Sequence, residues 1–272
     1  MRFGLMTRAV NALFCWPRNR RFPDEGRVCG RNVRIFVLQH APCKLPGFFA
    51  DRNVYVPLQC GRALHPAIEG TLGDDVGENI SASNADINEM TAIWWVGKHY
   101  EEIGNPDYVG FAHYRRKLSW RGDLLTDDAV LACKTLSWRT LKGFFEMFHP
   151  GEALEAFAGR FAERFGAEED GLFRKYLNGH VFYPCNCFLM SRESFRRYHA
   201  FIDVCVEIAL GLIRDGIVDR TKLDAYQKRV FGFILERMTS YWIWREKRVG
   251  RIRTVGCEIE EFDIANRTNS YR

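Results

Sequence analysis

The sequence predicts an α/β fold in which a mainly parallel sheet is flanked by helices. Short apolar runs that follow turn-forming residues recur along the chain, and they alternate with longer segments whose apolar residues fall at helical spacing. Loop, helix and strand follow one another between Gly73 and Leu118, which is the order of a β-α-β unit with parallel strands. With 272 residues and 47% hydrophobic content, the chain can build a sizeable core.

Charge and cysteine content narrow the classes of partner. Thirty-nine basic and 34 acidic residues leave a net charge of +5, and the two signs are interspersed. A nucleic-acid binder normally has a stronger and segregated basic surface, so nucleic acid is excluded as a partner. The nine cysteines form no regular framework, which indicates packing thiols in a reducing, cytoplasmic compartment. No run reaches the roughly eighteen apolar residues of a membrane span.

The chain divides into a basic N-terminal extension and linker (1–32), a single domain (33–258) and a polar tail (259–272). Apolar residues within 1–21 recur at helical spacing among arginines, a pattern typical of segments that lie in a membrane interface. We therefore consider peripheral contact of residues 1–21 with the cytoplasmic face of the inner membrane. The alternative is a frayed terminal extension.

The first strand is expected at Val33–Gln39, which is β-branched and aromatic and ends before Ala41-Pro42. His40 then lies at the tip of this strand, where open α/β sheets bind nucleotides; a solvent-facing histidine is the alternative. A second extended piece is expected at Val54–Leu58.

Turn-forming residues and short polar side chains are dense between Gly73 and Asn84, which indicates a loop. More well-aimed donors and acceptors are present than a connection needs, and we expect them to bind a nucleotide or sugar. An ordinary surface turn is the alternative. The candidates in this loop are Asp74, Asp75, Asn79 and Asn84.

Helical spacing begins at Ala85, with an apolar stripe that includes Ile87, Met90 and Trp94. Ser83 or Asn84 is expected to cap this helix. The charged residues off the stripe are expected to form a solvated face. These are Glu89, Lys98, Glu101 and Glu102.

The segment around which the rest is arranged is Asp107–Leu118, an apolar strand followed by a cationic cluster. His113, Arg115 and Arg116 follow the strand at the edge of the sheet where ligands bind, so they can hold an anionic group. The alternative is a basic turn that meets water.

Beyond Leu118 we expect a mostly helical insertion (120–178) over one side of the sheet. His180–Met190 returns to strand character, with Asn186 in its middle. A buried amide needs partners, and a ligand is one candidate. Cys185 and Cys187 would point to opposite faces of that strand, which makes them a poor metal pair.

The last helix is expected at Asp224–Ser240, with Arg229, Gly232 and Glu236 along one line. A glycine inside a helix indicates close approach by a backbone or a ligand. Glu236 with Arg237 is alternatively a surface ion pair. Arg251–Cys257 is expected to close the sheet as an edge strand.

Four stretches together resemble the bacterial family labelled domain of unknown function 4422, over about residues 33–245. They are the first strand with His40, the D-D-V-G-E-N-I-S-x-x-N loop, the F-A-H-Y-R-R segment, and Y-P-C-N-C-F-L-M with R-V-F-G-F-I-L-E-R. Members are found among capsular and exopolysaccharide biosynthesis proteins and are regarded as glycosyltransferases. The resemblance implies a GT-A-like nucleotide-diphospho-sugar transferase fold.

It also implies transfer from a nucleotide-sugar donor, such as a UDP-sugar or UDP-galactofuranose, to a growing saccharide or lipid-linked acceptor. The usual GT-A motif for a divalent metal is Asp-x-Asp after a central strand, and here His113-Tyr114-Arg115-Arg116 takes that place. A metal ligand set is therefore not predicted, and a Mg or Mn cofactor is left open.

Glycosyl transfer needs positive charge at the departing diphosphate and a base for the acceptor hydroxyl group. Arg115 and Arg116, with His113, are the candidates for the diphosphate, since guanidinium groups match phosphate oxygens bidentately. The base is Glu236, Asp75 or His113, between which spacing does not decide. Two other classes stay open: a catalytically silent saccharide or nucleotide binder, and a phosphoryl or nucleotidyl transferase, for which neither a P-loop nor a paired-carboxylate metal motif is found.

Overall fold

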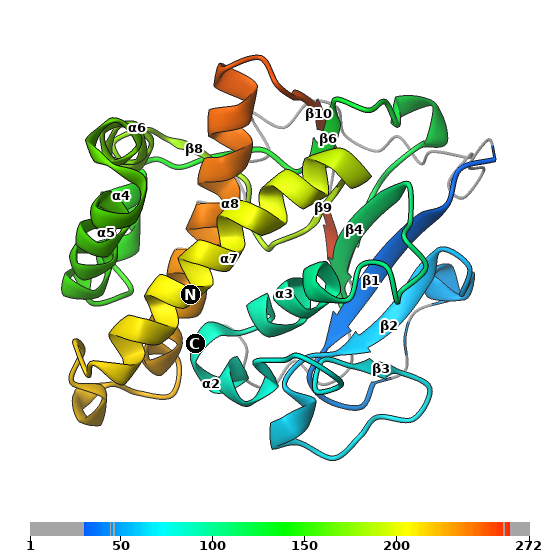
Figure 1. Cartoon of the computed structure of the whole chain (residues 1–272), viewed down its shortest axis with the longest axis horizontal. Helices are drawn as coiled ribbons and strands as arrows, with labels where there is room; N and C mark the ends of the chain where they lie inside the picture. Colours follow the sequence, from blue (N-terminus) through cyan, green and yellow to red (C-terminus); the bar gives the residue numbers. More distant parts are fainter. Residues whose placement is uncertain (1–29, 44, 46, 258, 262–272) are drawn as a thin grey trace.

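The computed structural model describes residues 30–43, 45, 47–257 and 259–261 (Figure 1). The membrane-contact expectation for residues 1–21 lies outside the described residues, as do the rest of the extension up to residue 29 and the tail from residue 262.

A mixed sheet runs through the domain in the order β10-β6-β9-β4-β1-β2-β3, with β5 and β11 branching from β4. The half formed by β4, β1, β2 and β3 is parallel, while β9 runs antiparallel between β4 and β6. A two-stranded sheet pairs β7 with β8. The strands are β1 (Val33–Gln39), β2 (Tyr55–Gln59), β3 (Leu72–Gly73), β4 (Tyr108–His113), β5 (Arg116–Leu118), β6 (Ala129–Ala132), β7 (Thr135–Leu136), β8 (Val181–Phe182), β9 (Phe188–Ser191), β10 (Arg253–Gly256) and β11 (Ile259–Glu261).

Helices form layers on one face of the sheet. In Figure 1, α3 lies over β4 and β1, α7 and α8 cross beside it, and α4, α5 and α6 pack on the far side of α7 and α8. Among short 3-10 turns, η2 (Arg62–Leu64), η3 (Ser81–Ser83) and η6 (Gln227–Arg229) concern the site. The α-helices are α2 (Asn84–Ile87), α3 (Met90–Lys98), α4 (Leu141–Glu146), α5 (Gly151–Phe165), α6 (Ala167–Leu177), α7 (Arg192–Arg214) and α8 (Val230–Arg248).

The central strands are buried on both faces because their alternate side chains enter two different cores. Phe36 of β1 and Phe111 of β4 pack into the larger core beneath the helices. Val37 of β1 and Ala112 of β4 point the other way, into a smaller core that also holds Trp120. This two-sided burial explains why these strands read as continuous apolar runs rather than as alternating ones.

Several predictions from the sequence are confirmed. The first strand spans Val33–Gln39, Ser191 caps α7 by accepting a hydrogen bond from the backbone N–H of Ser194, and Arg253–Gly256 forms an edge strand. The segment expected as a mostly helical insertion (120–178) carries α4–α6, but it also contributes β6, which lies inside the main sheet. Ile259–Glu261, which the sequence placed in the polar tail, forms β11 and pairs with β5. The last helix is α8, which begins at Val230 rather than Asp224.

The helix expected from Ala85 is broken in two. Asn88 separates α2 from α3 with a φ of 55° and a ψ of −145°, a conformation that is otherwise almost confined to glycine. Ser83 occupies the position before α2 but makes no side-chain cap hydrogen bond. Gly232 of α8 meets this break, because a Cβ there would lie 2.3 Å from Asn88 Nδ2 and 2.9 Å from the backbone carbon of Ile87. The close approach at Gly232 is therefore to the Asn88 side chain and to the backbone of Ile87.

Candidate functional site

The site is built where β4 ends and β9 begins. These strands are antiparallel with Phe111 opposite Phe188, so the residues just beyond the ladder, His113 and Asn186, face each other. His113 Nε2 donates a hydrogen bond to the carbonyl of Cys185, at 2.9 Å. Because β9 runs antiparallel to β4, the turn that precedes β9 (residues 185–187) lies at the edge of the sheet where the parallel strands end.

The Cys185–Asn186 turn differs from the expectation of a continuous strand through Asn186. Both residues have positive φ, 71° and 49° respectively, and Asn186 is 2% exposed. Its Nδ2 donates to Glu89 Oε1 at 2.9 Å, while its Oδ1 is buried without a partner. A buried acceptor left in this state costs about 1–3 kcal/mol.

Glu89 is a member of the site that sequence reasoning missed. It was assigned to a solvated face, but its side chain is only 21% exposed, and its Oε1 lies 3.8 Å from His113 Nε2. The break at Asn88 puts Glu89 at the position before α3, which turns it away from the course that one continuous helix would give it. The one available signal was the pair of asparagines at 84 and 88, which tolerate irregular backbone better than most residues.

Glu236 reaches the same turn from α8. Its Oε1 accepts a hydrogen bond from the backbone N–H of Cys185. Burial, and after it the negative charge of Glu89, raises the pKa of Glu236. The interpretation of Glu236 with Arg237 as a surface ion pair is wrong, because Arg237 is 5% exposed, donates to the carbonyl of Phe233 and lies over the ring of Phe145.

The two predicted arginines lie beside these groups. Arg116 is 6% exposed at the start of β5, and Arg115 lies over the ring of Tyr114. Burial lowers the pKa of His113 to about 4, and the positive charges of Arg116 and Arg115 contribute to this shift. His113 is thus neutral at pH 7, with its Nε2 proton directed at Cys185. We refer to Glu89, His113, Arg115, Arg116, Asn186 and Glu236 as the strand-end cluster.

His40 and Arg229 flank the strand-end cluster. His40 follows β1, and its ring meets that of Tyr114 edge to face at 5.6 Å. Partial burial, then the positive charges of Arg115 and Arg229, lower the pKa of His40. Arg229, at the end of η6, is thus a third cation within electrostatic reach, and the sequence had already placed it on one line with Glu236.

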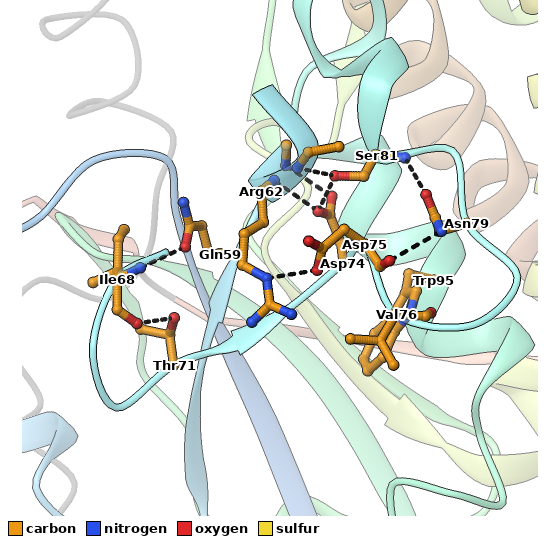
Figure 2. A network of polar contacts seen from close by, with 12 residues as sticks. Gln59, Arg62, Ile68, Thr71, Asp74, Asp75, Val76, Asn79, Ser81 and Trp95 are labelled. Atoms are coloured by element: carbon orange, nitrogen blue, oxygen red, sulfur yellow. Dashed lines mark hydrogen bonds and ion pairs between the residues drawn. The ribbon is translucent and has the colours of Figure 1, made fainter. Parts of the chain in front are cut away.

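The Gly73–Asn84 loop forms a separate polar network (Figure 2). Asp74 is fully buried and accepts from the backbone N–H groups of Gly61 and Arg62 and from the hydroxyl groups of Ser81 and Thr91, at 2.5–3.0 Å. All of this carboxylate's acceptor capacity serves the fold. The structure thus gives Asp74 a place in the fold, and its ligand-binding role stays a prediction.

The other loop candidates are also engaged locally. Asp75 pairs with Arg62, with 2.5 Å between Asp75 Oδ1 and Arg62 Nε. Asn79 donates to the carbonyls of Asp75 and Gly77, and Asn84 donates to the carbonyl of Asn88. Among the described residues, the structure does not bring Asp75 or Asn79 into contact with the strand-end cluster. Asn84 supports the break that positions Glu89.

A metal site is not evident in the part of the chain that the structure describes, where no group of three or more histidine, cysteine, aspartate or glutamate side chains could hold an ion. The strand end instead offers guanidinium groups, which do not fit a divalent cation. Two surface hollows lie elsewhere: one of about 420 Å³ between α3 and α7, and one of about 250 Å³ beside β1 and β2. Cys43, Cys60, Cys185, Cys187 and Cys205 are free thiols.

The mainly parallel sheet and its helical cover define an α/β domain. The solved apo structure of the bifunctional glycosyltransferase WbbM has this fold: its TM-score to this chain is 0.69 at 22% identity, and the match covers 84% of this chain and 45% of that one. The chain therefore spans less than half the length of WbbM. This likeness confirms the predicted GT-A-like fold.

The family model described as "Domain of unknown function (DUF4422)" matches residues 34–247, and the chain belongs to that family. The resemblance seen in the sequence is thus confirmed. No curated protein matches the sequence significantly. Within the described ranges, none of the helices combines the length and the apolar character needed to cross a bilayer.

Proposed function

We propose that the chain is a glycosyltransferase that moves a sugar from a nucleotide-diphosphate donor to a growing surface polysaccharide or lipid-linked oligosaccharide. A UDP-sugar is the first donor to test, UDP-galactofuranose included. The observation that carries the proposal is the placement of Arg115 and Arg116 directly beyond β4, where the charges of both act on His113 and that of Arg116 acts also on Glu236. Membership of the family and the shared fold support it.

In the proposed reaction, the bond between the anomeric carbon and the diphosphate oxygen breaks, and the diphosphate leaves with the electron pair. The guanidinium groups of Arg115 and Arg116 stabilise its negative charge, with Arg229 as a further cation. The acceptor oxygen forms the new bond to the anomeric carbon, and its proton passes to the carboxylate of Glu236. A raised pKa makes Glu236 a stronger base than an ordinary glutamate.

His113 has a different part in this proposal. Its Nε2 donates its proton to the carbonyl of Cys185, and the neutral ring lies 3.8 Å from Glu89 and within electrostatic reach of the arginines. It fixes the turn against the strand end and adds no charge near the diphosphate. Asp75, the third base candidate, is engaged by Arg62 in the loop network.

Cationic side chains take the place of a chain-bound metal in this proposal. The Asp-x-Asp motif is replaced by His113-Tyr114-Arg115-Arg116, and guanidinium groups can neutralise a diphosphate without a divalent ion. We therefore expect Mg or Mn to be dispensable for transfer.

A nucleotide-release assay over a panel of UDP-, GDP- and dTDP-sugars, with saccharide and lipid-linked acceptors, tests the proposal. Wild-type chain should release nucleoside diphosphate equally with and without EDTA. Arg115→Ala should lower release at least about 100-fold, as for removal of one charge-stabilising donor, while its thermal unfolding stays unchanged.

Arg139→Ala is the matched control, because the Arg139 guanidinium is exposed and lies over Trp138. This variant should keep wild-type activity. Full activity in Arg115→Ala contradicts the proposed electrostatic role. Donor binding without release under any condition identifies the catalytically silent binder instead.

A further inference from the structure

Glu89 and Asn186 form a pair within the strand-end cluster that has no part in the transfer chemistry described above. They come from segments nearly a hundred positions apart, and one hydrogen bond of 2.9 Å joins Asn186 Nδ2 to Glu89 Oε1. Both remaining oxygen atoms are acceptors. Asn186 Oδ1 is buried without a partner, and no hydrogen bond reaches Glu89 Oε2 from the described residues.

The chain holds this pair in an unusual backbone environment. Four described residues other than glycine have positive φ; one is Asn186 itself, and two others, Asn88 and Cys185, adjoin the pair. Such conformations persist only where the surroundings enforce them, and they gather at ligand sites. Two contacts enforce them here. The missing side chain at Gly232 leaves room for the break at Asn88, and Glu236 accepts a hydrogen bond from the backbone N–H of Cys185.

The position of the pair identifies the chemical class of its ligand. It adjoins His113, whose pKa is lowered in part by the two arginines assigned to the diphosphate. The group covalently attached to a donor's diphosphate is the sugar that is transferred. A sugar presents hydroxyl groups, which donate hydrogen bonds to amide and carboxylate oxygens.

We propose that Glu89 and Asn186 form the donor-sugar subsite, in which Asn186 Oδ1 and Glu89 Oε2 each accept a hydrogen bond from a sugar hydroxyl group. This inference rests on the proposed glycosyltransferase function and deepens it by naming the residues that recognise the sugar. In this role Glu89 binds substrate, whereas Glu236 takes the proton of the acceptor.

Isothermal titration of the whole chain with UDP and with UDP-sugars, or with GDP and dTDP counterparts, measures how much the sugar adds to affinity. Asn186→Gly removes the amide and suits the positive φ of this position, so it tests the side chain without adding backbone strain. Glu89→Gln removes the charge at nearly constant size. Each variant should reduce the affinity ratio of UDP-sugar to UDP about tenfold, as expected for one lost hydrogen bond to a ligand.

Affinity for UDP alone should stay within about twofold of wild type in both variants, because the arginines that hold the diphosphate are unchanged. Glu101→Gln is the control: Glu101 lies beyond α3, its side chain is 68% exposed, and it pairs with Arg196. Its affinity ratio should equal that of wild type.

An unchanged ratio in both variants of an active enzyme overturns the subsite and leaves the glycosyltransferase proposal standing. If the wild-type chain neither binds nor releases any nucleotide of the panel, both the subsite and the glycosyltransferase proposal are contradicted. A loss of UDP affinity in Asn186→Gly equal to the loss of UDP-sugar affinity also overturns the subsite, because the residue would then serve the nucleotide.

Discussion

The groups around Glu236 shift its pKa in opposite directions. Burial raises its pKa and the negative charge of Glu89 raises it further, while Arg237 and Arg116 act in the opposite direction. A carboxyl group with a raised pKa in the folded state binds its proton more tightly there than in the unfolded chain. Ionised Glu236 therefore opposes folding.

We expect Glu236→Gln to be more stable than wild type at neutral pH. Below the unfolded pKa, about 4.5, both side chains are neutral and the two proteins should be equally stable. As the pH rises through the raised folded pKa, wild type loses stability relative to the variant, and the difference then levels off. Urea unfolding between pH 4 and pH 8 measures this; a difference that shrinks with rising pH contradicts it.

Replacing Asp74 is expected to destabilise the fold, because its buried carboxylate accepts four hydrogen bonds. Asp74→Ala leaves two backbone N–H groups and two hydroxyl groups without their acceptor, and should destabilise the fold by about 3 kcal/mol. Asp75→Ala, which removes only a half-exposed ion pair with Arg62, should cost less than about 1 kcal/mol. Chemical denaturation compares the two; equal losses would show that the network in Figure 2 is less important than its contacts suggest.

At the scale of elements, the break between α2 and α3 matters most for the site. It lets Glu89 turn toward Asn186, and it fits against α8 only because position 232 has no side chain. The elements that carry Glu89 and Glu236 therefore meet at one glycine.

Gly232→Ala should separate α8 from the break. The added Cβ would meet Asn88 Nδ2 at 2.3 Å and the backbone of Ile87 at 2.9 Å, a clash expected to cost about 1–3 kcal/mol. Transfer should fall by about 100-fold, because small displacements of reacting groups have effects of that size. Gly159→Ala is the control in α5, where a Cβ meets nothing within 4 Å; it should gain up to about 1 kcal/mol and keep full activity. Equal behaviour of the two variants contradicts this role for Gly232.

Local signals predicted most elements but not the pairs that form the site. Val33–Gln39 and the Ser191 cap could be recognised because composition and capping act within a few residues. Glu89 was missed because a regular helix was assumed to continue through Asn88. Asn186 was placed inside a strand because the turn before β9 is imposed by its antiparallel pairing with β4, which involves residues far apart in sequence.

At the scale of the whole molecule, β4 is the centre of the sheet. It pairs with β1 on one side and β9 on the other, and its first five residues are buried. The edge strands β3 and β10 are shorter and carry exposed residues. The sheet is thus expected to open from its edges.

Hydrogen exchange should follow this order. Amide groups of β1, β4 and β9 should exchange only through global unfolding, with protection that equals the free energy of unfolding. Those of β3 and β10 should exchange faster by local opening. Exchange measured by mass spectrometry over peptides from each strand checks this; edge strands as protected as β4 would contradict it.

The order in which the cluster residues occur along the chain has a consequence for synthesis. Glu89 and both arginines precede Asn186, and Glu236 comes last, on α8. A nascent chain on the ribosome thus carries the cationic groups long before the carboxylate that completes them. On the proposed function, a chain whose α8 has not yet emerged lacks Glu236 and therefore has no base for the acceptor.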